Sequence, residues 1–157
     1  MTRVVCKSGK DLIFSFETMS KLGSDGMIHA YHDSSGYPTI GVGHLLSKVV
    51  NESLVKYPSM TVQAAHDLFD KDVIERAIQV DKLIKVAITD NQFGAILCLE
   101  FNIGIGNLTD STLIKKLNAK DSKESIGEEF DKWDKSCGVV SNGLIRRRKA
   151  EKDLFLS

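Results

Sequence analysis

Residues 27–42 constrain the fold more than any other segment, because their pattern is that of a β-hairpin. Tyr, Ile and Val recur there in a nearly alternating pattern, and Ser-Ser-Gly at residues 34–36 interrupts it as a turn does. Such a hairpin brings Asp33 and Thr39 near one another on either side of the turn. Helical spacing governs most of the remaining chain, so we expect a predominantly helical α+β fold with a small sheet.

A short helix is expected before the hairpin. Ser8, with Asp11 three residues later, has the spacing of a capping start. Leu12, Ile13 and Phe16 would face the core, and Glu17 would lie near the last turn of this helix.

Longer helices are expected after the hairpin. Thr61 opens the first of them, and apolar residues then recur at helical spacing: Val62, Ala65, Phe69, Val73, Ala77 and Val80. Asp90 is predicted to cap a further helix that stops at Gly104. Three shorter helical stretches would follow, up to Phe155.

Two carboxyl groups lie in contrasting surroundings. Glu17 ends an apolar stretch, whose desolvation favours the protonated form, whereas Asp33 lies beside serines and turn amides that favour the anion. Breaking a glycosidic bond requires such a pair, since one group must donate a proton and the other must stay ionised. The sequence therefore predicts a glycosidase with Glu17 as acid and Asp33 as base. The alternative is that Glu17 merely ends a helix and Asp33 merely opens a turn.

Length and composition fit one compact domain. The chain has 157 residues, of which 42% are apolar. Lys and Arg balance Asp and Glu at 21 each, so the strong positive field of a nucleic-acid-binding protein is missing and no such partner is expected. Cys6, Cys98 and Cys137 are too widely spaced for a disulfide framework or a metal cluster, so we expect free thiols and neither metal nor cofactor.

The chain shows no pattern for membrane targeting. Its first residues lack the apolar run of a signal peptide, and no segment approaches the ~20 apolar residues of a membrane span. We therefore expect synthesis in the host cytoplasm and no stable membrane insertion. Another component would have to carry the protein to a substrate outside that compartment.

Four blocks, in the same order, resemble the phage-type lysozymes, the endolysin family of muramidases that cut bacterial peptidoglycan. The resemblance covers nearly the whole chain, and four ordered blocks are far more specific than any one of them. The blocks are residues 12–17, residues 33–44, residues 101–104 with 111–113, and residues 143–155.

The resemblance implies a catalytic set of Glu, Asp and Thr, here Glu17, Asp33 and Thr39. Five residues separate Asp33 from Thr39, as in the family. Fifteen residues separate Glu17 from Asp33, more than the family usually has, and we assign the excess to an enlarged loop around residues 21–26. Asp25 lies nearer the usual distance, but it lacks the Thr and the glycine-rich segment that follow Asp33.

Other motif residues have a functional and a structural interpretation. Thr39 would orient the attacking water, or would be a plain β-branched strand residue. Gly41 and Gly43 would leave the sheet surface bare for a sugar, or would mark a bulge. His44 would support the hairpin through a hydrogen bond rather than catalyse. Asn102 would contact the substrate from the cleft wall, or would terminate its helix.

The basic run at residues 146–149 does not predict a nucleic-acid patch, because successive residues of a helix point about 100° apart. A solvated helix with one buried arginine is expected instead. The resemblance implies that an arginine of this helix, Arg147 or Arg148, lies near Glu17 and lowers the pKa of that acid.

The resemblance further implies a monomeric lysozyme domain over residues 1–157, with a sheet-bearing lobe at 12–60, a connecting helix at 61–80 and a helical lobe at 81–157. It would hydrolyse the bond between N-acetylmuramic acid and N-acetylglucosamine by inversion and so promote lysis of the host cell. By family resemblance a phage holin would supply the passage to the cell wall.

Two alternatives stay open. A lytic transglycosylase would use a single acid and no water, against which the pairing of Asp33 with Thr39 argues. A catalytically inactive peptidoglycan-binding protein would keep only the lysozyme shape, because fold does not fix function.

Overall fold

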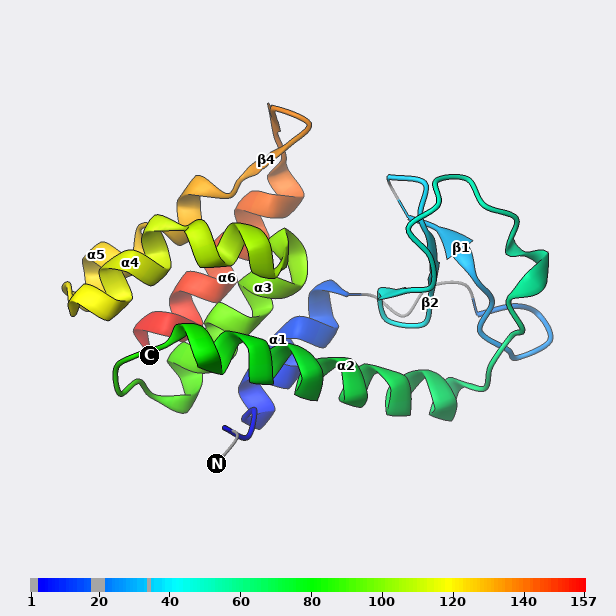
Figure 1. The fold of residues 1–157 in the computed structure, drawn as a ribbon, viewed down its shortest axis with the longest axis horizontal. Coiled ribbons are helices and arrows are strands. Elements are labelled where there is room, and N and C mark those ends of the chain that lie inside the picture. Colours follow the sequence, from blue (N-terminus) through cyan, green and yellow to red (C-terminus); the bar gives the residue numbers. More distant parts are fainter. Residues whose placement is uncertain (1–2, 18–21, 34) are drawn as a thin grey trace. The chain divides into compact units, whose positions relative to one another are not determined.

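The structure is a computed structural model, and it describes residues 3–17, 22–33 and 35–157. Contacts divide the chain into two compact units. Residues 1–16 and 74–157 form one, here called the helical unit, and residues 17–73 form the other, here called the sheet unit. The boundary falls inside the long helix α2 (Val62–Leu83), which therefore contributes to both (Figure 1).

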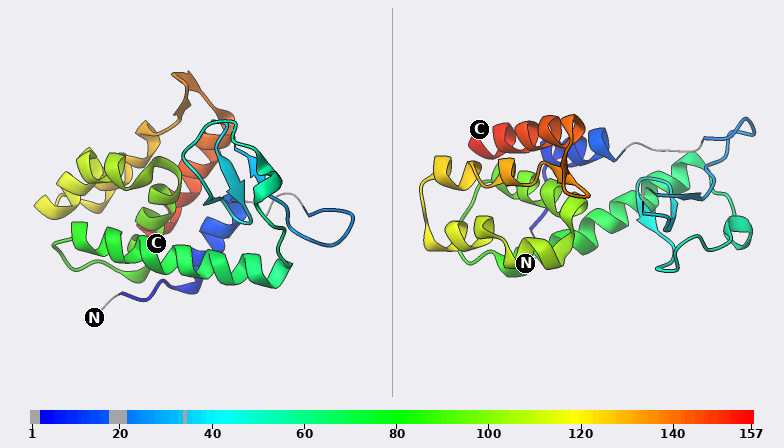
Figure 2. Two further views of the ribbon diagram at one scale, coloured as in Figure 1. Left: turned by 45° about the vertical axis from the view of Figure 1, so that its right-hand side comes forward. Right: turned by 90° about the horizontal axis from the view of Figure 1, so that it is seen from above.

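The helical unit is built around α3 (Asp90–Asp110), in which residues 93–100 are all buried. Helices α1 (Lys7–Phe16) and α6 (Asn142–Leu156) both pack against α3, and Figure 2 shows this arrangement from two further directions. The other elements of the unit are short: α4 (Thr112–Ala119), α5 (Lys123–Gly127), η2 (Phe130–Lys132), β4 (Lys135–Ser136) and β5 (Val139–Val140).

Helices α1 and α3 approach one another closely at a pair of glycines. A Cβ atom added to Gly9 would lie 2.8 Å from the Cα of Gly94, and one added to Gly94 would lie 2.8 Å from the Cα of Gly9. No larger residue fits at either position without moving a helix. The two glycines thus set the distance at which these helices pack.

Both predicted caps of these helices were wrong. The N-cap of α3 is Thr89, whose hydroxyl accepts from the Gln92 amide at 3.1 Å while the Gln92 side chain accepts from the Thr89 amide at 2.9 Å. Asp90 is the first residue of the helix instead. Helix α1 begins at Lys7, so Ser8 lies inside the helix rather than at its cap. The Ser8 hydroxyl instead donates to Asn91 Oδ1 of α3 at 2.8 Å.

The predicted stop at Gly104 is a break inside α3 rather than its end. Gly104 has φ 80° and ψ 158°, a conformation that favours glycine, and the helix then resumes as far as Asp110. Ser111 ends α3 and caps α4, since its hydroxyl accepts from the Ile114 amide at 3.2 Å.

The hairpin formed by β4 and β5 was not predicted. The two strands pair antiparallel across Cys137 and Gly138, which have φ values of 50° and 80°. Two successive left-handed residues form the tight turn that suits the twist of a hairpin. Asn-Gly is the common signal for such a turn, and Cys-Gly stands here in its place.

The sheet unit contains a three-stranded antiparallel sheet in the order β1 (Tyr31–His32), β2 (Pro38–Ile40) and β3 (His44–Leu45). In the register of β1 and β2, Tyr31 pairs with Thr39. The hairpin predicted for residues 27–42 is therefore confirmed. Apolar side chains of the sheet and of α2 form a small core beneath it: Ile28, Ile40 and Ala65, with Ala30, Leu46, Met60 and Leu68 around them.

Helix α2 begins as predicted, because the Thr61 hydroxyl accepts from the Ala64 amide at 3.1 Å. Its predicted apolar positions are buried from Ala65 to Val80, but Val62 is 37% exposed, since the first turn extends beyond the core. Among all helices formed by the described residues, none combines the length and the apolar character needed to cross a membrane.

Candidate active site

Glu17 directly follows the last residue of α1 and is grouped with the sheet unit. Its carboxyl group lies against the backbone of Gly43, where an added Cβ atom would come within 3.2 Å of Glu17 Oε2. Gly43 has φ 74°, so both its conformation and the nearby carboxyl group favour glycine. The turn that follows β2 thus leaves room for the predicted acid.

Asp33 follows β1 and is held by the backbone of the next turn. Its Oδ1 accepts from the amides of Ser35 at 2.8 Å and Tyr37 at 2.9 Å, and its own amide donates to Tyr37 O at 3.0 Å. Short polar side chains commonly bind their own turn in this way. Within the described residues, Oδ2 of this half-buried carboxylate accepts no hydrogen bond, so it is available to a water or a substrate.

Thr39 lies in β2 and is 4% exposed. Its hydroxyl donates to Tyr37 O at 3.0 Å, the same carbonyl oxygen that accepts from the Asp33 amide. Because the hydroxyl proton is used in this bond, the lone pairs of Thr39 Oγ1 remain as acceptors. One peptide group of Tyr37 therefore orients both predicted residues. Sequence reasoning did not single out Tyr37, although the spacing from Asp33 to Thr39 spans it.

Gly41 and Gly43 lie in the turn between β2 and β3 rather than in a strand or bulge, with φ values of 62° and 74°. A Cβ atom on Gly41 would lie 3.4 Å from the Cβ of Ala65 in α2. The first glycine thus allows the turn to pack on α2, while the second borders Glu17.

His44 begins β3, next to Gly43, and its Nδ1 contacts both carboxylate oxygens of Asp72 at 2.9 and 3.0 Å. Asp72 lies in the part of α2 that belongs to the sheet unit. The pair ties the sheet to the helix, which agrees with the supporting role expected of His44. Sequence reasoning missed Asp72, since only the tertiary fold brings the two residues together.

The remaining predicted residues, Arg147, Arg148 and Asn102, belong to the helical unit. The expectation of one buried arginine was wrong, because Arg147 is 5% exposed and Arg148 is 1% exposed. Both bind Glu151, which is 0% exposed, at 3.0 Å from Arg147 Nε and 2.7 Å from Arg148 Nη1. A carboxylate between two guanidinium groups offsets part of their charge, so the three groups can be buried together where two isolated cations could not.

Each arginine also has a partner in α3. Arg147 donates to the carbonyl oxygen of Cys98 at 2.9 Å, and its guanidinium lies 5.3 Å from the ring centroid of Phe16. Arg148 donates to the side-chain oxygen of Asn102. Asn102 lies inside α3, before the break at Gly104, rather than at a helix end. Its contact with a substrate stays a prediction.

Burial affects two titratable groups around this cluster. It raises the pKa of the Glu151 carboxyl, and the Arg148 and Arg147 guanidinium groups oppose that shift. Burial, together with the negative charge of Glu151, also raises the pKa of the Cys98 thiol far above its ordinary value. Cys98 is therefore unreactive. All three cysteines are free thiols, as predicted.

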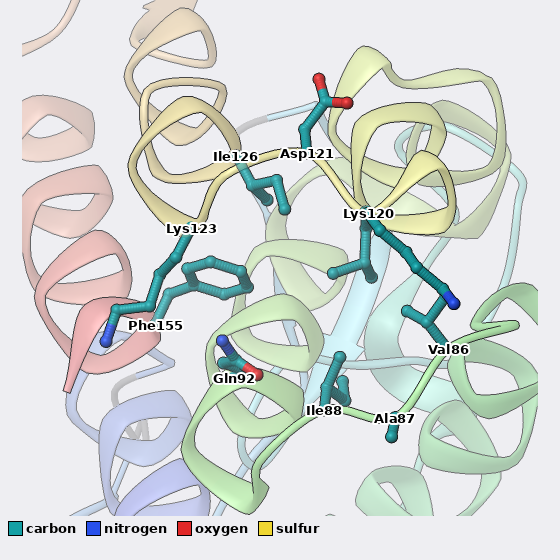
Figure 3. Close-up of a pocket in the computed structure, with 10 residues that line it drawn as sticks. Val86, Ala87, Ile88, Gln92, Lys120, Asp121, Lys123, Ile126 and Phe155 are labelled. Atoms are coloured by element: carbon teal, nitrogen blue, oxygen red, sulfur yellow. The ribbon is translucent and has the colours of Figure 1, made fainter.

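A cavity of about 320 Å³ lies in the helical unit between the connection from α2 to α3 and the ends of α4, α5 and α6. Figure 3 shows Phe155, Ile126 and Ile88 around it, with Lys120 and Lys123 at its edge. None of the site residues predicted from the sequence lines this cavity. Across the described ranges, no group of three or more His, Cys, Asp or Glu side chains is arranged to hold a metal ion.

Comparison with known proteins connects these features to one family. A sequence profile of the phage lysozymes matches residues 24–151. The endolysin of Bacillus phage B103 is 37% identical over 155 residues, which cover 98% of this chain and 54% of that protein. The endolysin of Salmonella phage P22 is 35% identical over 130 residues, covering 83% of this chain and 87% of that protein.

Solved structures show the same fold. The endolysin from Escherichia coli O157:H7 phage FAHEc1 superposes with a TM-score of 0.79 at 34% identity and covers 100% of this chain and 96% of its own. The chain spans about half the length of the two Bacillus phage endolysins that it matches, those of B103 and PZA. The fold is thus the mostly helical α+β fold expected from the sequence. Taken together, the matched profile, the relatives and the fold show that this chain belongs to the phage lysozyme family, a family of glycoside hydrolases.

Proposed function

We propose that the protein is a muramidase that hydrolyses the β-1,4 bond between N-acetylmuramic acid and N-acetylglucosamine in bacterial peptidoglycan. The observation that carries the proposal is that Tyr37 binds both residues: its amide donates to the Asp33 carboxylate, and its carbonyl oxygen accepts from the Asp33 amide and the Thr39 hydroxyl. Family membership supports the class of substrate.

In this proposal a water molecule is held between Asp33 and Thr39. Asp33 Oδ2 accepts one hydrogen of the water and Thr39 Oγ1 accepts the other, so a lone pair of the water oxygen points at the anomeric carbon. Asp33 takes up the proton as the new bond forms. Both acceptor atoms have the capacity that this step requires, since Asp33 binds its turn through Oδ1 and Thr39 Oγ1 uses its proton to donate to Tyr37 O.

Glu17 is the general acid. It protonates the glycosidic oxygen as the bond to the anomeric carbon breaks, and the turn at Gly43 leaves its carboxyl group room to act. Attack by water on the face opposite the leaving group inverts the anomeric configuration. We therefore predict that the two carboxyl groups lie roughly 6.5–9.5 Å apart, as a water between them requires, rather than the ~5 Å of a retaining pair.

The biological setting follows from the same proposal. The protein would act on the cell wall as a monomer and promote lysis of the host, with peptidoglycan as its partner and with holin help on the way to the wall. We further propose that the sheet unit and the helical unit are lobes of one lysozyme domain joined by α2. The helical unit would then contribute Asn102, and Arg147 or Arg148, to the site.

The proposal is tested by mass spectrometry of the products formed when the purified protein digests isolated peptidoglycan. Fragments that end in reducing N-acetylmuramic acid are expected, and the Asp33→Asn variant should not form them. Anhydromuramic ends would instead identify a transglycosylase. An intact wall that retains the protein would identify a binding protein with the fold of an enzyme.

A further inference from the structure

The enlarged loop that separates Glu17 from Asp33 is built by hydrogen bonds over its described part. Leu22 and Ile28 form a β-bridge, and the Gly23 amide donates to Met27 O at 2.8 Å. The Gly26 amide donates back to Gly23 O at 3.0 Å, and Gly26 has φ 74°. Residues 22–28 therefore form a small hairpin-like turn of defined shape.

This turn fixes the orientation of one imidazole ring. The Asp25 carboxylate accepts from the Met27 amide at 3.0 Å and contacts His29 Nε2 at 3.0 and 3.1 Å. Both side chains pack over Gly23, where an added Cβ atom would lie 2.5 Å from Asp25 Oδ1 and 2.9 Å from the His29 ring. The hydrogen bond from the Met27 amide, followed by that from His29, lowers the pKa of Asp25. Because carboxylate oxygens only accept, the proton of the contact between these two side chains is on His29 Nε2.

A pocket of about 460 Å³ opens between the turn and the sheet. Leu22 and Gly23 of the turn, residues 29–32 leading into and forming β1, and Leu54 line it. Its volume lies within the range of small-ligand sites. Strand β1 is at the edge of the sheet, and Asp33 is the residue after His32. The lining of the pocket therefore ends one residue before Asp33 of the candidate active site.

The polar side chains among the described residues that line the pocket are those of His29, Tyr31 and His32. His32 Nε2 lies 2.9 Å from Glu52 O, and because a carbonyl oxygen only accepts, this nitrogen carries the proton. In the singly protonated form of each ring, Nδ1 of His32 and Nδ1 of His29 are left with a lone pair, and neither atom has a partner among the described residues. None of the described residues that line the pocket is Lys or Arg.

These properties select a neutral ligand that carries hydroxyl or amide donors and an apolar face. A carboxylate-bearing stem peptide would meet neither Lys nor Arg among the described lining residues and would approach the Asp25 carboxylate. A pyranose with hydroxyl and acetamido donors matches the two imidazole acceptors, while Leu22, Leu54 and Tyr31 offer surface to its apolar face and methyl group. We propose that this pocket is an accessory subsite that binds one N-acetylhexosamine of the glycan strand beside Asp33.

The proposal rests on the proposed function, and it assigns the enlarged loop to substrate binding. Since the subsite would hold the glycan in the ground state and the transition state alike, its loss should raise KM and leave kcat unchanged. A longer glycan that reaches the subsite should bind more tightly than one that does not.

The test is an NMR titration of the whole chain with chitotriose, which carries N-acetylglucosamine but no peptide. Saturable shifts are expected at the ring signals of His29 and His32. Leu22→Ala removes an exposed apolar side chain of the pocket and should weaken binding about three- to tenfold. Val55→Ala removes a side chain that is 95% exposed and does not line the pocket, so it should leave binding unchanged. His29→Leu, which loses the acceptor and keeps an apolar side chain, provides a second variant and should also weaken binding.

Three outcomes would overturn the subsite: no shift at His29 and His32, equal effects of Leu22→Ala and Val55→Ala, or shifts only with fragments that carry a stem peptide. The outcomes for the subsite and for the muramidase remain separable. If the protein digests peptidoglycan but chitotriose shifts neither His29 nor His32, the subsite is contradicted and the muramidase reaction stands. If chitotriose shifts the His29 and His32 signals but the protein forms no reducing muramic ends, the proposed reaction is contradicted and the subsite stands.

Discussion

In the helical unit, Arg147 and Arg148 are buried around the fully buried carboxylate of Glu151, and they also donate to Cys98 and Asn102 of α3. In the sheet unit, the carboxylate of Asp33 is half-buried and uses one oxygen for its turn while the other stays available. The two units therefore keep charge in different ways. The helical unit buries the Glu151 carboxylate among cationic partners. The sheet unit keeps the Asp33 carboxylate at the surface, where Oδ2 can still accept a hydrogen bond.

This difference separates stability from chemistry. A buried carboxylate with two guanidinium partners has no capacity for a substrate, and removing it leaves uncompensated charge. A surface carboxylate fixed by backbone amides can bind a water, and removing its charge costs the fold little. Substitutions in the helical cluster should thus change unfolding, whereas substitutions at the candidate catalytic residues should change turnover.

The largest effect is expected for Glu17→Gln, which keeps the shape of the side chain but removes the proton donor. Turnover should fall by about 10²–10⁴-fold, the usual contribution of a positioned acid. The unfolding midpoint should stay close to that of the parent protein. Asp11→Asn, on the exposed face of α1, is the matched control and should leave both properties unchanged. Full activity of Glu17→Gln would remove the acid assignment.

Glu151→Gln should instead lower the free energy of unfolding by about 3–5 kcal/mol, because two buried guanidinium groups lose their carboxylate. Urea unfolding followed by the fluorescence of Trp133 measures the change. The control on the same helix is Asp153→Asn, which breaks the exposed pair with Lys149 and should cost about 0–1 kcal/mol. Equal losses in the two variants would contradict the structural role given to the cluster.

Asp72→Asn tests whether the sheet is fixed to α2 through His44. The loss of a charged hydrogen-bond partner should cost about 1.5–3 kcal/mol, less than in the helical cluster because His44 is 33% exposed. Hydrogen exchange should show reduced protection of the backbone amides of β2 and β3. Glu75 is an exposed residue further along α2. In the Glu75→Gln control, the exchange rates of the β2 and β3 amides should equal those of the parent protein.

The smallest effect concerns acid unfolding of the sheet unit. Lys56, with Ser47 and Tyr57, lowers the pKa of Glu52 from 4.5 to about 2 in the folded state. Its contribution to stability is therefore present above pH 4.5 and is lost as the pH falls from 4.5 toward 2. Glu52→Gln should flatten the pH dependence of hydrogen exchange in the sheet unit over this window. An unchanged pH dependence would show that Glu52 gains nothing from its partners on folding.

Local patterns predicted much of the sheet unit. Alternation and the Ser-Ser-Gly interruption indicated the hairpin, and the spacing of Asp33 and Thr39 indicated that they share a turn. Thr61 opened α2 as expected, because a cap depends on residues only three positions away. The order of the sequence blocks indicated the family, which the comparisons confirmed.

Features that depend on tertiary contacts were not predictable from such patterns. Arg147 and Arg148 are both buried because Glu151 lies between them, and a pattern of charges along one helix does not show where the core lies. The contact of His44 with Asp72 joins residues far apart in the chain. The roles of the individual site residues stay predictions, since they depend on how a substrate binds.

The most direct test of the central claim is the anomeric configuration of the first product, followed by proton NMR at early times during cleavage of a soluble peptidoglycan glycan. In the proposed mechanism a water held by Asp33 and Thr39 attacks the face opposite the leaving group, so the new reducing end should appear first as the α-anomer. The same signal should be lost in Asp33→Asn. A reducing end that appears first as the β-anomer would show a retaining reaction and would contradict the proposed role of Asp33 and Thr39.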